Sequence, residues 1–481
     1  MTNEEILQLL KKGENDKVEF KKSKNSLPDS VWETYSAFAN TDGGIIILGI
    51  AEKKPNSYSI SGVANPDKIV KEFWNQINNP QKVNINILFN RNVSVHFINN
   101  KNIIAINILR AGRQEKPIYI NNNIMTGAFR RNADGDYHCP TSEIKAMLRD
   151  QTEISADSTI YNSLPFTKLI TETFRRYRIR FKNLKPNHIW NSLEDDELLL
   201  KIGAVKRADN KLQPTLAGIV MFCNEQIITS ILPDYFLDYR EKTIESEVRW
   251  TDRLQSNSGN WSGNVFDFYF NIIDKILLTT KIPFQLQSIS RIDETPFHEA
   301  IREAVANTLI HADYHGQRGI VIEKLPNAIR FCNPGNFRIP ITTAAEGGIS
   351  DPRNSTIFKI FSLVGIGERA GSGIYSIHHV WETNKFPKPV LSEKFNPERI
   401  LFYLQWNIKN KSSGKTFESS GKTSDKIIVL IEKNSSITIP EMSQILKIST
   451  RAVEKQLNNL KKSNQIKRIG SAKTGHWESI K

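Results

Sequence analysis

The chain has 481 residues, 39% of them hydrophobic, which is enough for several packed cores and about three domains. Lys and Arg outnumber Asp and Glu by 65 to 51, and the net charge of +14 favours a polyanionic partner, either nucleic acid or an anionic membrane surface. The three cysteines form no CxxC pair, which argues against a zinc ribbon or a disulfide framework. The chain start lacks a signal-peptide pattern, and the longest apolar run, residues 43–51, is too short to span a bilayer. We therefore expect a cytoplasmic protein with no membrane partner.

Residues 1–150 alternate short helices with strands. Helices are predicted near residues 3–12 and 30–40, and the sequence TDGG at residues 41–44 predicts a turn into a buried strand. Further strand patterns continue to about residue 119, and a helix follows Pro140. This order predicts an α/β or α+β domain.

The middle of the chain is less regular. Residues 151–285 predict a mixed α/β scaffold with its own core, and residues 286–407 alternate helix, strand, glycine-rich loop and helix. Residues 408–425 have the composition of a flexible Gly/Ser linker. The linker contains SSGKT twice, but a phosphate-binding P-loop needs a glycine where Lys409 and Thr416 stand. We therefore reject a P-loop motor.

Residues 426–481 have the pattern of a winged helix-turn-helix. Residues 450–462 predict the third helix, with Val453, Leu457 and Leu460 on its inner face. Basic residues in and after this helix could contact phosphates, although the same pattern also fits a solvated face of a protein-binding module. These candidate nucleic-acid-binding residues are Arg451, Lys455, Lys461, Lys462, Lys467 and Arg468.

The N-terminal motifs resemble the Schlafen/AlbA-type nucleic-acid-binding domain. The resemblance is carried by GENDKVEFKKS, by SAFANTDGGIIILGIAE and by the later GAFRR, which contains Arg130 and Arg131 as further candidates for nucleic-acid contact. In nucleases of this kind, carboxylates cut structured RNA such as transfer RNA. The resemblance implies catalytic roles for Glu14, Glu19, Lys21 and Glu52, with the three carboxylates holding Mg²⁺ or Mn²⁺. Glu52 departs from the family's acidic pair, and a domain that only binds nucleic acid remains the alternative.

Residues 297–315 resemble the first motif of Bergerat-type (GHKL) ATPases. Glu303 and Asn307 share one helix face, and the resemblance implies that Asn307 completes a magnesium–phosphate site. Asn333 stands where the family has the aspartate that accepts the adenine amino group, followed by Gly335. The loop at residues 365–374 resembles the phosphate-covering lid. The resemblance therefore implies bound ATP, with a cofactor-binding set of Glu303, Asn307, Asn333, Gly335, Gly367, Gly371 and Gly373.

The sequence as a whole predicts a multidomain α+β protein. It combines a Schlafen/AlbA-like α/β domain (1–150), a scaffold region (151–285), a Bergerat-like α/β sandwich (286–407), a linker (408–425) and a winged helix (426–481). One hypothesis is a nucleotide-regulated, metal-dependent nuclease that acts on RNA in stress or phage defence. The alternative is an ATP-sensing transcriptional regulator that binds DNA, and a scaffold with inert sites is a third. Whether the chain forms a homodimer is left open.

Overall fold

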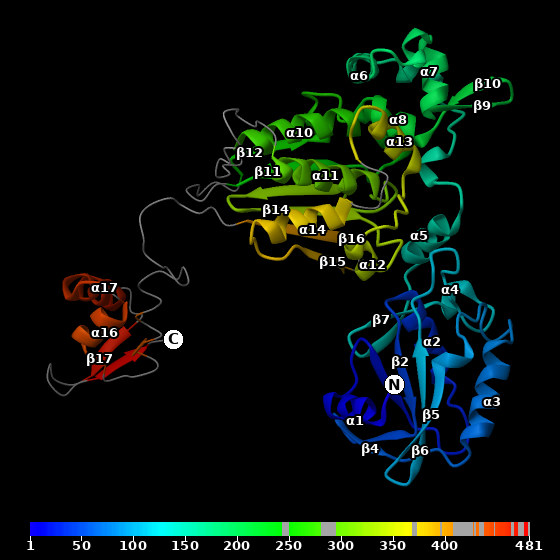
Figure 1. Ribbon diagram of the computed structural model, residues 1–481, viewed down its shortest axis with the longest axis vertical. Helices are drawn as coiled ribbons and strands as arrows, with labels where there is room; N and C mark the ends of the chain where they lie inside the picture. Colours follow the sequence, from blue (N-terminus) through cyan, green and yellow to red (C-terminus); the bar gives the residue numbers. More distant parts are fainter. Residues whose placement is uncertain are drawn as a thin grey trace. The chain divides into compact units, whose positions relative to one another are not determined.

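The computed structural model divides the chain into two compact units, Met1–Ile408 and Lys409–Lys481 (Figure 1). Mixed helices and sheets confirm the predicted multidomain α+β class. The linker predicted over residues 408–425 lies outside the described residues. The residues that the structure describes are 1–242, 250–279, 295–367, 373–394, 397–406, 427, 430–431, 437–446, 448–462, 466–469 and 476–479.

The N-terminal part of the first unit is built on a four-stranded sheet in the order β1-β2-β6-β5. Strand β1 runs parallel to β2, and the other neighbours are antiparallel. Alternate strand residues separate two cores: Ile46 and Ile106 pack under α2 and α3, whereas Ile47 and Ile103 pack under α1. The elements are α1 (Asn3–Lys12), β1 (Val18–Lys21), α2 (Ser30–Asn40), β2 (Gly44–Leu48), α3 (Pro66–Ile77), β5 (Val93–Ile98) and β6 (Lys101–Ile108).

The predicted turn at residues 41–44 joins α2 to β2. Gly43 has φ +72°, and a Cβ atom there would lie 2.7 Å from the Ile108 carbonyl oxygen, so both the dihedral and the space require glycine. Smaller elements complete this part of the unit: β3 (Ile50–Lys54), β4 (Ser57–Ile60), η1 (Asn90–Asn92), α4 (Ile124–Gly127), β7 (Phe129–Asn132), β8 (Gly135–His138) and α5 (Thr141–Gln151).

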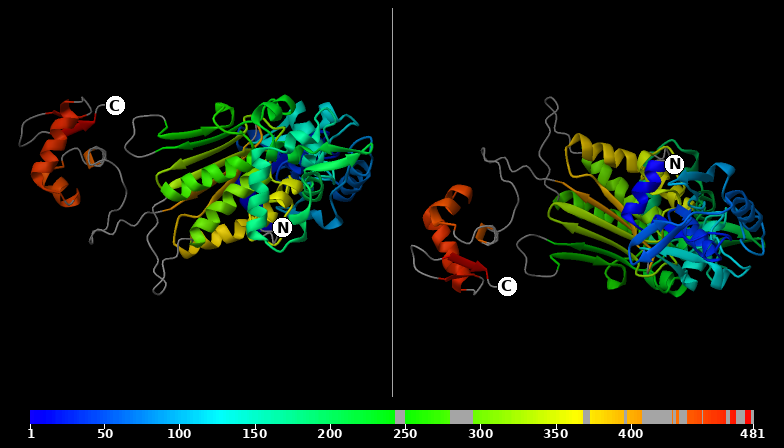
Figure 2. Two further views of the ribbon diagram at one scale, coloured as in Figure 1. Left: turned by 90° about the horizontal axis from the view of Figure 1, so that it is seen from above. Right: turned by 90° about the horizontal axis from the view of Figure 1, so that it is seen from below.

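A six-stranded sheet, ordered β12-β11-β13-β14-β16-β15, forms the second half of the first unit. Helices α10, α11 and α14 pack together beside it (Figures 1 and 2). The strands are β11 (Leu237–Glu241), β12 (Asp252–Gln255), β13 (Ile320–Leu325), β14 (Ala328–Pro334), β15 (Val390–Lys394) and β16 (Arg399–Gln405). The helices are α10 (Val265–Thr279), α11 (Pro296–Ile310), α12 (Ile341–Glu346), α13 (Ser355–Leu363) and α14 (Gly373–Thr383).

This sheet corrects the predicted boundary at residue 285. Strand β11, from the expected scaffold, pairs in parallel with β13, from the expected ATPase-like domain. A parallel pair needs a crossover connection, and here α10 and α11 lie in that connection. One hydrophobic cluster extends from Leu169 to Trp406, so the two regions share a core.

The remaining elements before β11 are short helices and one hairpin. They are η2 (Ala156–Ser158), η3 (Phe166–Leu169), α6 (Glu172–Leu184), η4 (Ile189–Ser192), α7 (Asp195–Ile202), β9 (Val205–Ala208), β10 (Lys211–Pro214), α8 (Leu216–Phe222) and α9 (Glu225–Ile231), with η5 (Ser256–Ser258) after β12.

The second unit contains helices α16 (Ile439–Leu446) and α17 (Thr450–Lys462) and the antiparallel pair β17 (Ile466–Ile469) and β18 (His476–Ser479). Val453, Leu457 and Leu460 are buried with Trp477 in its core, as the predicted inner face requires. Two helices followed by a hairpin are what the structure describes here, and the winged helix itself stays a prediction.

Candidate functional sites

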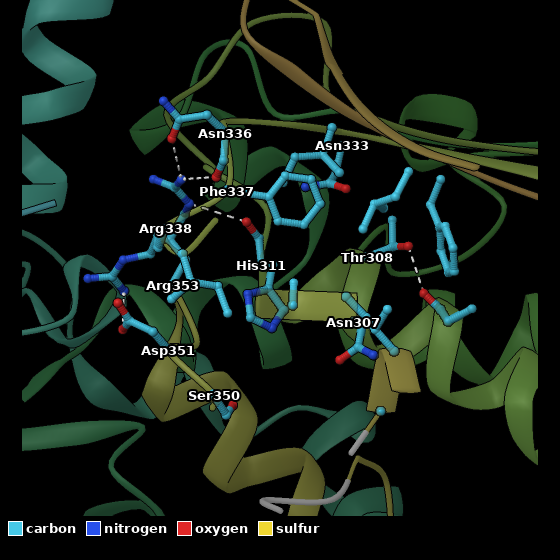
Figure 3. Close-up of a pocket in the computed structure, with 18 of the residues that line it drawn as sticks. Asn307, Thr308, His311, Asn333, Asn336, Phe337, Arg338, Ser350, Asp351 and Arg353 are labelled. Carbon is cyan, nitrogen blue, oxygen red and sulfur yellow. Dashed lines mark hydrogen bonds and ion pairs between the residues drawn. The ribbon is translucent and has the colours of Figure 1, made fainter. Parts of the chain in front are cut away.

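A pocket opens between α11, the end of β14 and the start of α14 (Figure 3). The space in and above it, including open solvent at its mouth, is about 900 Å³. Of the predicted nucleotide-binding residues, Glu303, Asn307, Asn333 and Gly373 line it. The structure therefore brings together one residue set that is spread over 71 positions of the sequence.

Glu303, Asn307 and Gly373 meet at one end of this pocket. The Asn307 amide donates to Glu303 Oε1 at 3.1 Å, as expected for side chains four residues apart on a helix. A Cβ atom on Gly373 would lie 2.2 Å from Glu303 Oε1 and 3.0 Å from Asn307 Nδ2. A larger residue at position 373 would therefore have to displace the Glu303 and Asn307 side chains.

The other predicted glycines lie elsewhere. Gly335 has φ +102° and packs against Arg353 and Asp313, and Gly367 has φ +76° and packs against Phe358 and Ile310. Neither lines the pocket, so the structure gives them backbone roles in turns. Gly371 lies outside the described residues.

The opposite wall of the pocket contains residues that the sequence did not assign. Phe337, Arg338 and Asp351 line it together with His311. Burial, reinforced by the positive charges of Arg353 and Arg338, lowers the pKa of His311 to about 4, so its imidazole is neutral near pH 7. A neutral histidine and the amide of Asn333 can each donate and accept hydrogen bonds, which suits recognition of a heterocyclic base.

The predicted N-terminal carboxylates lie around Tyr58. Glu14 Oε1 accepts a hydrogen bond from the Phe20 amide at 2.9 Å, and the Tyr58 hydroxyl lies 3.3 Å from Glu14 Oε2. Glu52 faces Tyr58 across the β3–β4 hairpin and accepts from the Asn56 amide at 2.9 Å. Burial raises the pKa of Glu14; the Phe20 amide opposes this rise and the Glu19 carboxylate reinforces it.

Glu19 is engaged on both of its oxygens. Lys21 Nζ donates to Oε1 at 2.6 Å, and Arg131 Nη2 donates to Oε2 at 2.8 Å. Among the described residues there is no group of three His, Cys, Asp or Glu side chains that could hold a metal ion. The geometry of Glu14, Glu19 and Glu52 thus does not fit the expected Mg²⁺ or Mn²⁺ site.

Arg131 corrects an expectation. It was a candidate for nucleic-acid contact, but only 4% of the residue is exposed. Its guanidinium donates to Glu19, to Asp136 at 2.8 Å and to the Asn15 carbonyl at 2.8 Å, and it lies over the Phe38 ring. Arg131 therefore ties β1 to β7 and β8 from inside. Arg130 is mostly buried too and donates to Glu143 at 2.9 Å.

Comparison with known families matches three segments of the chain to family models. Residues 14–140 match the family model "Schlafen, AlbA_2", and residues 317–402 match "Putative ATP-dependent DNA helicase recG C-terminal". The chain contains a Schlafen AlbA_2 domain and a recG C-terminal-type domain. The second match begins after α11, so Glu303 and Asn307 precede it. Residues 145–238 match a domain of unknown function, which overlaps the predicted scaffold.

Solved structures are more distant. The DIP2311 protein from Corynebacterium diphtheriae is 12% identical, with 97% of this chain and 95% of that chain covered and a TM-score of 0.40. The N-terminal domain of a "Putative ATP-dependent DNA Helicase RecG-related Protein" from Nitrosomonas europaea is 25% identical over 25% of this chain and 82% of that one, with a TM-score of 0.19. These TM-scores are too low for either likeness to support a conclusion. A search of curated proteins found no match.

Two arginines of the Schlafen domain reach the pocket wall of the recG-type domain. Arg110 Nη1 donates to Asp42 at 2.7 Å, while its Nη2 donates to the Phe337 carbonyl at 2.7 Å. Arg113 Nε donates to Asp351 Oδ2 at 2.7 Å. Burial alone would raise the pKa of Asp42, but Lys17 and Arg110 outweigh it and the pKa lies below its ordinary value.

Two further arginines extend this contact around α5. Arg149 Nη2 donates to Asp313 Oδ2 at 2.6 Å, and Arg353, which lines the pocket, binds Asp150 and donates to the His311 carbonyl at 3.2 Å. We name Arg110, Arg113, Arg149 and Arg353 the arginine bridge. Sequence patterns do not reveal these pairings, because in most of them the two residues lie between 68 and 238 positions apart.

The candidate phosphate-contacting residues of the second unit lie on α17 and β17. Arg451 and Lys455 are exposed on α17. Lys461 and Arg468 both lie over the Trp477 ring, at 5.1 and 4.9 Å from its centroid, and Lys467 pairs with Glu478 at 2.8 Å. The Lys462 side chain lies outside the described residues. Arg451 and Lys455 are thus the members of this set placed most openly for a phosphate backbone.

None of the helices in the described part of the chain combines the length and the apolar character needed to span a bilayer.

Proposed function

We propose that this protein binds nucleic acid and that a nucleotide in the pocket of the recG-type domain changes that binding. The Schlafen match, the helicase-derived name of the second family model and the basic helix α17 support an association with nucleic acid. Following the resemblance to Bergerat-type ATPases, Asn307, Glu303 and Gly373 would hold the phosphate end of ATP with its magnesium ion, and Asn333 would lie near the base.

The arginine bridge is the observation that carries this proposal. Phe337 and Asp351 form the pocket wall, and each accepts a hydrogen bond from an arginine of the Schlafen domain. A ligand that contacts this wall shifts the same residues that hold Arg110 and Arg113. Arg110 also binds Asp42 in the turn at residues 41–44, which precedes β2 in the Schlafen domain. The pocket wall and this turn are therefore joined through one arginine.

The test measures nucleic-acid affinity with and without ATP. We expect ATP to change the Kd of the full-length protein for labelled transfer RNA or duplex DNA by about fivefold, near the lower end of ordinary allosteric coupling. Arg113→Gln should abolish this change while ATP itself still binds. Arg175→Gln is the matched control, because Arg175 is exposed on α6 and pairs only with its helix neighbour Glu172 among the ion pairs described. If ATP binds and the wild-type Kd stays the same, the regulatory part of the proposal is wrong.

RNA cleavage is the second candidate function. It is favoured by the raised pKa of Glu14 beside Glu19 and Lys21, because a raised pKa makes a carboxylate a better proton acceptor. Total transfer RNA incubated with magnesium, manganese or a chelator should be cut by the wild type and left intact by Glu14→Gln. Equal cutting by both proteins would remove Glu14 from the reaction, and no cutting under any condition would leave binding as the function.

A further inference from the structure

A second cleft lies between the Schlafen and recG-type domains. Helix α5 forms one of its walls, and the loop that joins α11 to β13 forms another. The space in and above it, including open solvent at its mouth, is about 1050 Å³, near the upper end of the range for small-molecule sites. Among the described residues, none lines both this cleft and the nucleotide pocket. We call it the α5 cleft, and it is a separate site.

The carboxyl groups inside the α5 cleft are largely neutralised. Glu143 accepts a hydrogen bond from Arg130 Nη1 at 2.9 Å, and Asp313 accepts one from Arg149 Nη2 at 2.6 Å. Burial and the Glu143 carboxylate raise the pKa of Glu398 to about 8, so this group carries a proton near pH 7. These three groups therefore oppose a bound anion less than free carboxylates would.

Two cations at the rim of the α5 cleft are left without an acidic partner. Lys145 is exposed on α5 and Arg318 is exposed on the loop after α11, and neither forms an ion pair within the described part of the chain. Asp234, also exposed, is the one other carboxylate among the described residues that line the cleft. Unpaired cations thus outnumber unpaired carboxylates, which favours an anionic ligand.

The backbone holds Arg318 in an unusual conformation. Its φ of +68° lies in the left-handed region, which is unfavourable for a residue with a side chain. Arg399, which is buried, donates to the Gly319 carbonyl at 2.7 Å and to the Gln317 carbonyl at 3.4 Å, so it fixes the chain on both sides of Arg318. Strained residues of this kind gather at functional sites. The fold therefore keeps the Arg318 cation at the rim of the cleft.

Arg130 supplies donors deeper in the same cleft. Its side chain is 12% exposed, and its Nε is buried without a hydrogen-bond partner among the described residues. A buried N–H group without an acceptor is unfavourable. The Nε and Nη2 atoms of a guanidinium form the edge that binds two oxygens of a phosphate or a carboxylate, and the bond to Glu143 uses Nη1 instead. The α5 cleft thus offers donors at two depths.

We propose that the α5 cleft binds a terminal phosphate group, a phosphate monoester, through Lys145, Arg318 and Arg130. A monoester has three acceptor oxygens and nearly two negative charges near pH 7. It also reaches into a cleft end first, whereas an internal phosphodiester has a sugar on either side. The group comes either from the end of a nucleic-acid strand or from a free mononucleotide. For a strand, this inference deepens the proposed function and rests on it, since it assigns the place where the strand end binds.

The experiment measures whether a terminal phosphate strengthens binding to the full-length protein. The probes are 20-mers of uridine and of deoxythymidine with an internal fluorophore, and they carry a 5′-phosphate, a 3′-phosphate or hydroxyl groups at both ends. We expect one phosphorylated end to lower the Kd by about tenfold relative to the hydroxyl probe, because its hydrogen bonds are charge-assisted. Calorimetric titration with uridine monophosphate, and with uridine as its control, tests the mononucleotide as the source.

Four variants locate the effect. Lys145→Gln and Arg318→Asn each remove one rim cation, and asparagine tolerates a positive φ, so the preference for the phosphorylated end should fall to about twofold or less. Arg130→Lys keeps a cation beside Glu143 but lacks the Nε–H group, and should also reduce the preference. Lys71→Gln is the matched control, because Lys71 is an exposed lysine on α3 of the same domain, and it should keep the preference. Circular dichroism establishes that each variant is folded.

The outcomes separate this inference from the proposed function. A tenfold preference that Lys145→Gln and Arg318→Asn remove would place a strand end in the cleft. Binding of uridine monophosphate that the same variants lose, with no end preference in the 20-mers, would make a mononucleotide the ligand. If the variants match the wild type in both assays, the α5 cleft is wrong, and the proposed function stands wherever the 20-mers still bind. If the wild type binds no nucleic acid, the proposed function fails, and the titration with uridine monophosphate alone decides the cleft.

Discussion

The carboxylates of the Schlafen domain and the pocket of the recG-type domain use similar polar side chains in opposite ways. Glu19 is 8% exposed, and both of its oxygens are held by cations of the same domain. Glu303 and Asn307 bond to each other at the end of a pocket that is open to solvent. Polar groups bound internally stabilise a fold, whereas polar groups that face a cavity can bind a ligand. The following predictions test whether the two regions differ in this way.

Replacing Arg131 should have the largest effect. Arg131→Met leaves the buried Glu19 and the partly buried Asp136 without their common cation, so we expect the free energy of unfolding to fall by about 3–5 kcal/mol. Denaturant unfolding followed by circular dichroism measures this change. Lys17→Met is the control, because the Lys17–Asp42 pair is almost half exposed and its loss should change stability by less than about 1 kcal/mol. Similar stabilities for both variants would contradict the internal role of Arg131.

Glu398 offers a pH-dependent test beside the arginine bridge. Burial and the Glu143 carboxylate raise its pKa to about 8, although Arg353 opposes the rise. Between about pH 4.3, the ordinary pKa of Glu, and pH 8, the folded protein keeps a proton that the unfolded chain loses, so this group makes stability fall as the pH rises. The free energy of unfolding of Glu398→Gln, relative to that of the wild type, should therefore rise by on the order of 1–3 kcal/mol when the pH is raised from 5 to 8.5.

Thermal unfolding of both proteins at the two pH values measures this difference. Glu382→Gln, an exposed glutamate on α14, should follow the wild type at both. A constant difference between Glu398→Gln and the wild type would show that Glu398 is ionised in the folded protein, and would contradict a buried neutral carboxyl group.

The smallest effect is expected in the pocket. Asn307→Ala removes a side chain that lines the cavity and bonds to Glu303, so the Kd for ATP should rise about tenfold, the equivalent of about 1.4 kcal/mol. Calorimetric titration with ATP and magnesium measures it, and Asn187→Ala, on an exposed loop, should bind as the wild type does. A large loss of stability in Asn307→Ala, with unchanged ATP affinity, would show that Asn307 stabilises the fold, as Glu19 does, and does not bind the ligand.

Local patterns predicted the elements of both regions. The spacing of Glu303 and Asn307 placed both on one helix face, and the Asp42-Gly43-Gly44 turn required a positive φ that the structure has. The roles of Glu19 and Arg131 could not be predicted in the same way, because they lie 112 positions apart and only the folded sheet brings them together. The sequence also drew a boundary at residue 285 that the parallel pairing of β11 with β13 removes.

The arginine bridge has a practical consequence for dissecting this protein. Arg110, Arg113 and Arg149 precede residue 152, whereas their acceptors Phe337, Asp351 and Asp313 lie far beyond it. A fragment truncated after α5 would lose these acceptors, although Arg110 would keep Asp42 and Arg113 the Asp150 carbonyl, and its guanidinium groups would be more open to solvent. Such a fragment would adhere to polyanions more strongly than the same domain does within the intact chain, so affinities measured on it would overstate the native interaction.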